Sequence, residues 1–371
     1  GHEIACDQFR LPIESPKKAF KTSGPKLTVS TNGDNLSASS SKVNFVFNRK
    51  TGIVTSYKVD GTEYFSEGFG IQPNFWRAPT DNDYGNGMPK RLQVWKESSK
   101  NFNVTDATVT MDGNNAVVNV NYLLPAGNLY IVNYTIYPSG AVNVAARFTS
   151  TDMDAAQTEV SEATRTATFT PGRDAARKEA SKLNVPRIGV RFRLPASMNQ
   201  VEYFGRGPAE NYLDRNAGSM IGLYKSTAEE LYFPYVRPQE NGHHTDTRWV
   251  SLSTGKKGLL IQADNTIGFN ALRNSIEDFD DEEATGLPRQ WSNFTPEQVA
   301  NHDEAAAKSV LRRQHHINDI TPRDFVEVCV DLKQQGVAGY DSWGSRPEPA
   351  YTLPANREYN WGFTLTVSYT H

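Results

Sequence analysis

Short segments of alternating residues, separated by turn-forming residues, recur along most of this 371-residue chain and restrict its fold more than any other feature. In each segment apolar and polar residues largely alternate, which is the two-residue period of a strand with one buried face. Many gaps contain pairs such as Asp60-Gly61 or Asp112-Gly113, which favour tight hairpin turns. The segments are 27–31, 43–48, 53–59, 62–66, 104–111, 116–124, 129–137, 141–148, 187–194, 200–205, 249–254, 258–264, 325–332 and 359–369. They predict an all-β fold, a large sandwich of stacked antiparallel sheets with few short helices.

Three segments interrupt this pattern. Residues 172–182 and 296–314 have the composition of helices, and residues 277–284 (EDFDDEEA) form an acidic run. We expect all three to be solvated insertions on the surface of the sandwich.

The overall composition excludes several classes of partner. Apolar residues make up 37% of the chain, which is enough for a sizeable core, and the formal net charge is only -3. A charge this small provides no basic surface for nucleic acid, and no apolar run is long enough to span a bilayer. Cys6 and Cys329 are too far apart in sequence to indicate a disulfide framework or a metal motif. We expect a soluble protein, and the sequence leaves its compartment open between periplasm and cytoplasm.

The loop at residues 336–347 is the strongest functional signal. Gly336, Gly339, Gly344 and Pro347 surround a single tryptophan, Trp343. A flexible backbone that holds a rigid aromatic ring is suited to offer a flat apolar face to a sugar. The alternative is a core tryptophan at the end of a strand.

Other loops are rich in polar side chains that can bond their own backbone. Residues 71–85 run from a strand into a turn that contains Asp81, Asn82 and Asp83. Residues 205–215 and 234–249 are polar loops between apolar strands. Each segment could serve function or could brace a loop.

Four motifs in these segments closely resemble the C-terminal small-chain domain, domain 5, of family-two β-galactosidases. They are WRAPTDNDYG (76–85), YFGRGPAENYLDR (203–215), YVRPQENGHHTDTRW (235–249) and GVAGYDSWG (336–344). The opening GHEIACDQF also resembles the end of the immunoglobulin-like domain that precedes domain 5 in the family. The resemblance implies that residues 1–24 are the tail of that domain with a linker. Residues 25–371 would then form the small-chain β-sandwich, a galactose-mutarotase-like supersandwich, in either an excised fragment or a natural split subunit.

The resemblance also implies a division of labour between this chain and a catalytic barrel. The paired catalytic glutamates of the family belong to the barrel, and nothing in this sequence matches the motifs that carry them. Because retaining glycoside hydrolysis needs two carboxyl groups at the scissile bond, this chain should not hydrolyse galactosides alone. The expected partners are the barrel and, through it, the galactoside, with a possible homo-oligomer of the full-length protein. No cofactor is expected in this chain, whereas the barrel commonly uses Mg and Na.

The resemblance assigns no catalytic residue here, but it implies a substrate-binding role for the Asp-Ser-Trp motif. Trp343 would be a stacking platform for the sugar, and Asp341 and Ser342 would shape its loop by bonding backbone N–H groups. The family motif is often Gly-Gly-Asp-Asp-Ser-Trp, whereas Ala338 and Tyr340 replace a Gly and an Asp here. Further candidates in the site loops are Arg77, Asp81, Asn82, Glu240, His243 and His316. No metal site is expected, because the neighbours His243 and His244 would face opposite ways on a strand.

Two alternatives remain open. The first is a free-standing carbohydrate-binding module with Trp343, Trp76 and Trp249 as candidate platforms, although strand-like surroundings favour the core for Trp76 and Trp249. The second is a mutarotase-like aldose epimerase, which needs a general acid and a general base around the sugar ring. Its candidates are Glu240, His243, His244 and His316.

Overall fold

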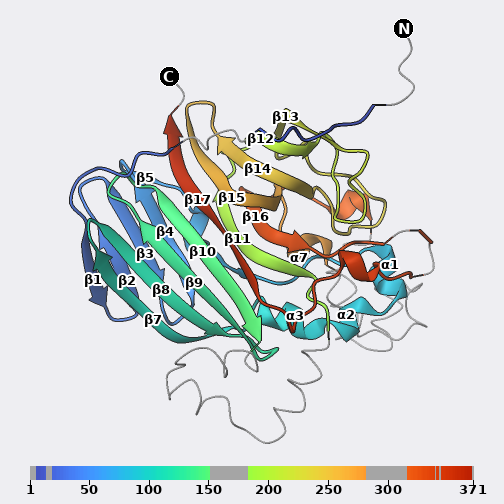
Figure 1. Ribbon diagram of the computed structural model, residues 1–371, viewed down its shortest axis with the longest axis horizontal. Helices are drawn as coiled ribbons and strands as arrows, with labels where there is room; N and C mark the ends of the chain where they lie inside the picture. The colour runs from blue at the N-terminus through green and yellow to red at the C-terminus, as the bar shows by residue number, and fades with distance from the viewer. Residues whose placement is uncertain are drawn as a thin grey trace, which may run out of the picture.

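Two antiparallel sheets form most of the molecule. The computed structural model describes residues 6–13, 19–150, 183–280, 316–338, 340–341 and 344–369. In these ranges the strands form one sheet of five strands and one of twelve (Figure 1). The predicted all-β antiparallel architecture with few short helices is therefore confirmed.

The strands and helices have the following bounds. The strands are β1 Thr28–Asn32, β2 Asn35–Ser39, β3 Val43–Asn48, β4 Ile53–Val59, β5 Thr62–Glu63, β6 Gln72–Asn74, β7 Asn103–Asp112, β8 Asn115–Leu123, β9 Asn128–Ile136, β10 Val142–Ser150, β11 Arg187–Pro195, β12 Gln200–Gly207, β13 Met220–Thr227, β14 His244–Ser253, β15 Lys257–Leu272, β16 Phe325–Gln334 and β17 Tyr359–Tyr369. The helices are α1 Asp81–Gly85, α2 Met88–Arg91, α3 Gln93–Ser98 and α7 Ile276–Phe279, with 3-10 turns at Ser66–Gly68, Ile317–Asp319 and Pro349–Tyr351.

Residue alternation and turn chemistry account for the hairpins. In β3 and β8 every second side chain is buried, as the two-residue period of a strand requires. The β4–β5 turn has positive φ at both Asp60 (48°) and Gly61 (78°), the backbone of a tight hairpin turn. These local signals explain why the sequence placed β3, β4 and β17 at their observed bounds.

The five-stranded sheet packs against strands β7 to β10 of the larger sheet. Aromatic rings fill the space between them, and the ring of Tyr134 lies 5.5 Å from that of Phe45 and 6.2 Å from that of Phe47. The buried Tyr57 hydroxyl donates a hydrogen bond to the Gly140 carbonyl across the same interface, at 2.5 Å. These contacts make the left half of Figure 1 a sandwich of two layers.

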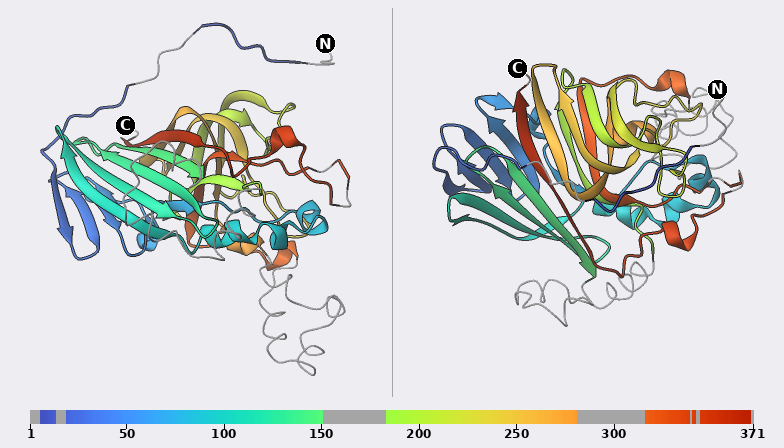
Figure 2. Two further views of the ribbon diagram at one scale, coloured as in Figure 1. Left: turned by 60° about the horizontal axis from the view of Figure 1, so that its bottom comes forward. Right: turned by 45° about the horizontal axis from the view of Figure 1, so that its top comes forward.

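Strand β15 joins this sandwich to a more strongly curved half, which Figure 2 shows from two further sides. Its first part, Lys257 to Ala263, pairs with β17, and its last part, Gly268 to Leu272, pairs with β16. Strand β11 then pairs with both β16 and β6. The sheet therefore divides at β15. One branch continues through β17 to the two-layered sandwich, and the other continues through β16 to β11 and β6 in the curved half.

Three short helices follow β6, where the sequence analysis expected a turn. Thr80 caps α1, because its hydroxyl accepts from the Asp83 N–H while the Asp83 carboxylate accepts from the Thr80 N–H. In α3, the buried Trp95 lies against the rings of Phe75 and Phe148 at 6.4 and 5.9 Å between ring centres. The polar cluster at 81–83 thus starts a helix whose neighbours cover the core.

The acidic run departs from expectation where it is described. Its first residues belong to α7, and Asp278 and Asp280 are buried, so residues 277–280 are not a solvated insertion. Asp280 Oδ2 accepts from Trp76 Nε1 at 2.7 Å and lies 2.8 Å from Lys96 Nζ. Trp76 is 3% exposed and therefore belongs to the core. The predicted helices at 172–182 and 296–314, and residues 281–284, lie outside the described residues.

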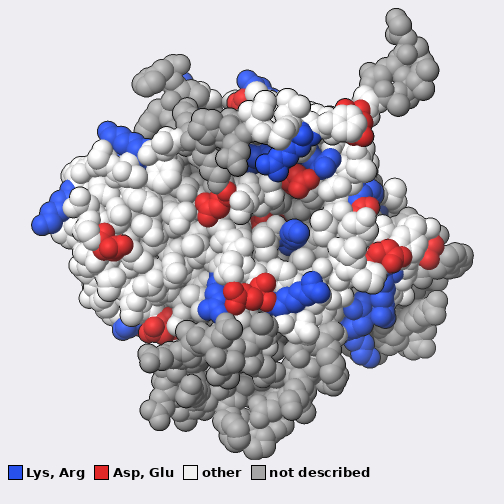
Figure 3. All heavy atoms as spheres, in the orientation of Figure 1, with Lys and Arg blue, Asp and Glu red and all other residues white. Residues whose placement is uncertain are grey.

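Two further observations concern the surface. On the face drawn in Figure 3, acidic and basic side chains are interspersed. In the described part of the chain, no helix has the length and apolar character needed to cross a membrane.

Candidate functional site

Four segments that are distant in sequence meet at one end of the molecule, near α1 in Figure 1. They carry parts of the four motifs, and we call them together the loop platform. Its segments are 80–86, 208–215, 234–242 and 336–345, of which 339, 342 and 343 are not described. Side chains of the platform itself fasten these segments to one another.

The first and third segments are joined through Asp81. Its backbone N–H donates to Gln239 Oε1 at 3.2 Å, and its carboxylate accepts from Gln239 Nε2 at 3.4 Å. Arg237 reaches the same carboxylate at 3.5 Å and lies over the ring of Tyr84, 3.8 Å from the ring centre. Because Asp81 is largely exposed and Arg237 is partly exposed, the ion pair adds little by itself, and the stacking on Tyr84 is the more directional contact.

Glu210 joins the second segment to the third. Its largely buried carboxylate accepts from the Gly242 N–H at 2.7 Å and from the Tyr235 hydroxyl. Arg215, on the same segment as Glu210, pairs with this carboxylate at 3.1 Å. The Tyr212 hydroxyl also donates to Glu210 Oε2, at 3.3 Å. The two carboxylate oxygens, with about four lone-pair positions, therefore serve four donors, as in a well-satisfied buried carboxylate.

The fourth segment is held from two sides. At its start, the Asp214 carboxylate accepts from the N–H groups of Val337 and Ala338 at 3.0 and 2.7 Å. Near its end, Asn86 Nδ2 donates to the Ser345 carbonyl at 3.2 Å. A side-chain carbon on Gly344 would come within 2.4 Å of the Gly85 carbonyl carbon, so this close approach requires glycine.

The site residues predicted from sequence that fall in the platform segments are Asp81, Asn82, Glu240, Asp341, Ser342 and Trp343. Asp81 and Asp341 are exposed, and Asn82 is half-buried. Asp341 Oδ1 accepts from the Ser345 N–H at 3.1 Å, which braces the loop. Trp343 and Ser342 lie outside the described residues, so the sugar-binding roles of all these residues stay predictions.

Two further predicted residues lie under or beside the platform. Arg77 is fully buried beneath α1, where its guanidinium pairs with Asp83 at 2.5 Å. It supports α1 and does not reach the surface. His316 is exposed and precedes Ile317, whose N–H donates to the Val236 carbonyl at 3.1 Å. His316 is therefore a neighbour of the third segment.

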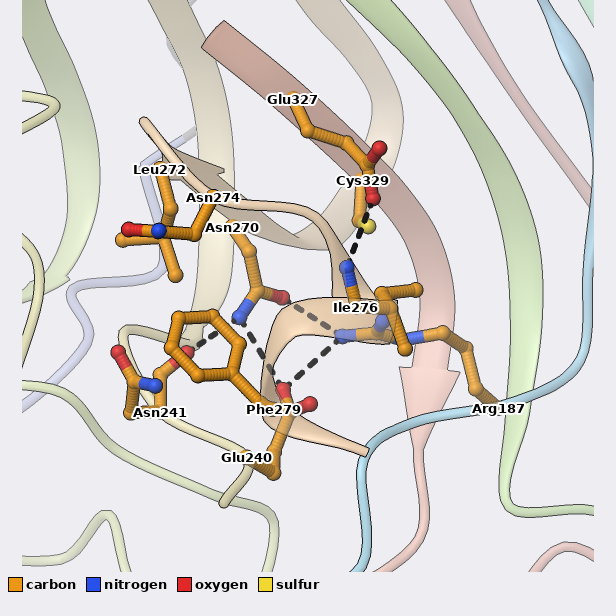
Figure 4. Close-up of a pocket in the computed structure, with 10 residues that line it drawn as sticks. All are labelled: Arg187, Glu240, Asn241, Asn270, Leu272, Asn274, Ile276, Phe279, Glu327 and Cys329. Atoms are coloured by element: carbon orange, nitrogen blue, oxygen red, sulfur yellow. Dashed lines mark hydrogen bonds and ion pairs between the residues drawn. The ribbon is translucent and has the colours of Figure 1, made fainter. Parts of the chain in front are cut away.

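Glu240 lies in the third segment, but it is buried and joins His243 in a group that we call the buried charge cluster. Its members are Arg187, Glu240, His243, Asn270, Asp331 and Gln334, and Figure 4 shows several of them. Glu240 Oε1 accepts from Arg187 at 3.2 Å, from Asn270 at 3.1 Å and from Gln334 at 2.9 Å. Asn270 Oδ1 accepts from Arg187 at 2.6 Å and lies 2.9 Å from His243 Nδ1. An amide oxygen can only accept, so His243 Nδ1 is the donor in this second contact. His243 therefore carries a proton on Nδ1.

Burial sets the charges of this cluster. Asp331 is completely buried with Oδ2 3.1 Å from Arg187 Nε, and burial raises its pKa to about 7 against the attraction of that guanidinium. Burial also lowers the pKa of His243 well below its usual value, and nearby Arg187 lowers it further. The pKa of His244 falls to about 4 for the same main reason, burial. Both histidines are therefore neutral near pH 7.

The sequence analysis missed Arg187 and Asp331, although both lie in strands that it predicted. In β16, Glu327, Cys329 and Asp331 share one face, and Arg187 and Arg191 share a face of β11. Alternation predicts that such a face meets water, whereas these five residues are at most 6% exposed. Repeated charges of both signs on paired strand faces are the signal that could have indicated a buried ionic layer.

The cavity in the cluster is too small for a sugar. It measures about 20 Å³, enough for one or two water molecules, whereas ligand pockets are on the order of 300 Å³ or larger. His244 has both ring nitrogens near backbone carbonyls, those of Gly242 and Pro208, at 3.1 and 3.2 Å. With His243 and Glu240 also committed to protein partners, this geometry disfavours the epimerase alternative.

Among the described residues, no three His, Cys, Asp or Glu side chains are grouped as metal ligands. Trp249 lies partly buried on β14. The buried charge cluster offers no open binding site, so the loop platform is the candidate functional site.

Comparison with known proteins agrees with the four motifs. Residues 39–365 match the family model described as β-galactosidase small chain. A β-galactosidase of Priestia megaterium is 31% identical over 368 residues, 98% of this chain and 30% of that protein. A β-galactosidase small subunit of Latilactobacillus sakei is 27% identical over 332 residues, 87% of this chain and 92% of that subunit. Among solved structures, a galactose 1-epimerase from Lactobacillus acidophilus NCFM aligns over 93% of this chain and 98% of its own, with a TM-score of 0.43 and 8% identity.

These matches differ in how much of each relative they cover. The chain spans about 30% of the length of the Priestia protein but corresponds to nearly all of the Latilactobacillus small subunit. The family model covers most of the chain, including all four segments of the loop platform. By this match and by its similarity to both relatives, the chain belongs to the β-galactosidase small-chain family.

Proposed function

We propose that this chain completes the galactoside-binding site of a separate catalytic barrel in a family-two β-galactosidase, and that it does not hydrolyse galactosides alone. In this role the chain corresponds to domain 5 of the full-length enzyme. The observation that carries the proposal is the convergence of the four motifs on the loop platform, which fixes the loop of Trp343 at both of its ends. Membership of the small-chain family and the length match to a small subunit support a larger catalytic partner.

In the proposed site, Trp343 stacks against the sugar. A pyranose presents C–H groups on one face, and an indole ring below them gains apolar contact while the hydroxyl groups remain available to the barrel. Asp341 and Ser342 shape the loop that carries the ring. Exposed apolar side chains in the platform segments or next to them in sequence, Phe233 (48%), Val236 (77%) and Tyr340 (66%), support contact with a protein partner.

The barrel supplies the chemistry in this proposal. A retaining glycosidase needs a nucleophilic carboxylate and an acid about 5 Å apart, on either side of the scissile bond. The buried acids of the present cluster, Glu240 and Asp331, both pair with Arg187 and line no space for a sugar. We also assign any Mg or Na to the barrel, because the described part of this chain groups no set of metal-ligating side chains.

The test is hydrolysis of a chromogenic β-galactoside by this chain alone, by a barrel-containing large chain alone and by their mixture. We expect activity only in the mixture. In the mixture, Trp343→Ala should weaken galactoside binding on the order of tenfold, because the stacking face is lost, and should leave assembly intact. Assembly is measured by sedimentation, and binding by inhibition with galactose.

A matched variant separates stacking from a general loss of aromatic surface. Phe204→Ala removes an aromatic side chain that is 37% exposed on β12, outside the loop platform, and should leave galactose inhibition unchanged. Unaltered inhibition in Trp343→Ala would contradict the stacking role. Activity of this chain alone would overturn the assignment of catalysis to the barrel.

A further inference from the structure

We propose that Asp214 is a positioning residue, which holds the base of the Trp343 loop from another loop more than a hundred residues earlier in the chain. The inference rests on the proposed function of Trp343, and it adds a residue that none of the predicted sites includes. Its basis is the contact between the Asp214 carboxylate and residues 336–338.

The carboxylate meets the loop base at three successive residues. Its oxygens accept from the N–H groups of Val337 and Ala338 at 3.0 and 2.7 Å. It also lies directly against Gly336, where an added side-chain carbon would be 2.4 Å from Asp214 Oδ2. Ala338 has a φ of 57°, a left-handed conformation that residues other than glycine seldom adopt. A negative group that binds two consecutive N–H groups stabilises this backbone path.

Asp214 is itself held in a closed turn. Tyr212 and Arg215, on either side of it, exchange backbone hydrogen bonds of 3.2 and 2.8 Å. The ring of Tyr212 is 2% exposed and stacks on His243, while Arg215 pairs with Glu210. Among the described residues, no Lys or Arg side chain forms an ion pair with Asp214. The carboxylate oxygens are therefore available to accept from the N–H groups of the loop base. The carboxylate is therefore an organised anchor on a packed support.

The first experiment measures the anchor without any sugar. Hydrogen exchange of the peptide that contains Val337 and Ala338 is followed in this chain and in Asp214→Ala. Because both N–H groups lose their acceptor, we expect exchange to accelerate on the order of tenfold. Asp214→Asn, which keeps one acceptor oxygen, should show a smaller increase. Unchanged exchange in both variants would overturn the proposal.

Asp246→Asn is the matched control for this experiment. Asp246 is a partly exposed aspartate in β14, and it pairs with Arg206 at 2.6 Å instead of with the loop base. Its loss should leave exchange of the 337–338 peptide unchanged. Faster exchange in this variant too would show that any lost aspartate loosens the loop, which would also overturn the specific role of Asp214.

The second experiment asks whether Asp214 acts through Trp343, with the chain assembled on its catalytic partner. Asp214→Ala should weaken galactose inhibition on the order of tenfold, and should weaken it no further when Trp343→Ala is already present. Equal weakening in both backgrounds would overturn the positioning role. If Trp343→Ala alone has no effect, the proposed function fails, and the exchange experiment still decides whether Asp214 anchors the loop.

Discussion

The loop platform and the buried charge cluster use the same residue types for opposite purposes. In the platform, Asp81 is largely exposed and Arg237 is partly exposed, and the carboxylates of Glu210 and Asp214 bind backbone N–H groups of neighbouring loops. In the cluster, Arg187 and its acidic partners are sealed inside the curved half of the sheet. Glu240 lies in the third platform segment and reaches Arg187, so the two regions adjoin.

The difference shows that charge density alone does not identify a functional site. Buried charges in the cluster pair with one another around a cavity the size of one or two water molecules, which offers no room for a ligand such as a sugar. The platform charges fasten loops and leave apolar side chains such as Val236 and Tyr340 exposed. We therefore expect cluster variants to change stability, and platform variants to change binding.

The largest expected effect is at the centre of the cluster. Arg187→Met should lower the free energy of unfolding by about 3–5 kcal/mol, because Glu240 and Asp331 would lose their shared buried cation. Arg237→Met is the platform control and should cost about 1 kcal/mol or less, because that guanidinium is partly exposed and its partner Asp81 is largely exposed. Urea unfolding of both variants measures the contrast, and similar losses would remove the distinction between the two regions.

A second difference concerns pH. Burial raises the pKa of Asp331 to about 7, so between about pH 4 and 7 the folded protein holds a proton that the unfolded chain has released. The stability contributed by Asp331 therefore falls as the pH rises, by about 1.4 kcal/mol per pH unit in that window. In Asp331→Asn this component is absent. The stability of the wild type relative to Asp331→Asn should accordingly fall from pH 5 to pH 7.

His243 and His244 act in the opposite direction. Burial lowers the pKa of both histidines. Below about pH 6.5 the unfolded chain therefore binds protons that the folded protein does not bind, and the free energy of unfolding falls as the pH falls. Both histidines are present in the wild type and in Asp331→Asn, so their contribution largely cancels in the difference. Urea unfolding of the two proteins at several pH values provides the measurement. A difference that stays constant from pH 5 to 7 would contradict an elevated Asp331 pKa.

The smallest expected effect sharpens the comparison from the platform side. In Gly336→Ala the new methyl group would displace the Asp214 carboxylate, and we expect a loss of about 1–2 kcal/mol in unfolding free energy. In an Asp214→Ala background the same substitution should cost about 1 kcal/mol less, because the clashing carboxylate is gone. Thermal unfolding of the four proteins gives the coupling.

Gly218→Ala is the control for this cycle. A side-chain carbon at Gly218 would meet no atom within 4 Å, so the substitution should change stability by about 0.5 kcal/mol or less. If the losses of unfolding free energy in Gly336→Ala and Asp214→Ala are strictly additive in the double variant, the two residues are not energetically coupled, which would contradict the expected clash.

Much of the fold could be predicted from the sequence because its signals are local. Alternation and turn residues placed β3 and β4, whereas β13 was missed because it lies at a sheet edge and has no alternating burial pattern. Helix α1 has only five residues, too few for a helical period, so its Thr80 cap resembled an ordinary turn.

The candidate site was predictable in part. The motifs indicated which loops matter, and all four contribute to the platform. Sequence could not indicate which side chain fastens which loop, since Asp214 and Val337 are 123 residues apart in the chain. It also could not show that the charged face of β16 is buried, because alternation alone predicts a solvent-facing side, whereas α7 and the loop at residues 240–241 lie against part of this face.

The position of β17 has a consequence for biosynthesis. This strand lies between β10 and β15, so that Val142 pairs with Leu365 and Lys257 with Tyr369. Until residues 359–369 leave the ribosome, β10 and β15 each keep an unpaired edge, which is a hazard for association with other nascent chains. The two halves of the larger sheet can therefore unite only after residues 359–369 have left the ribosome.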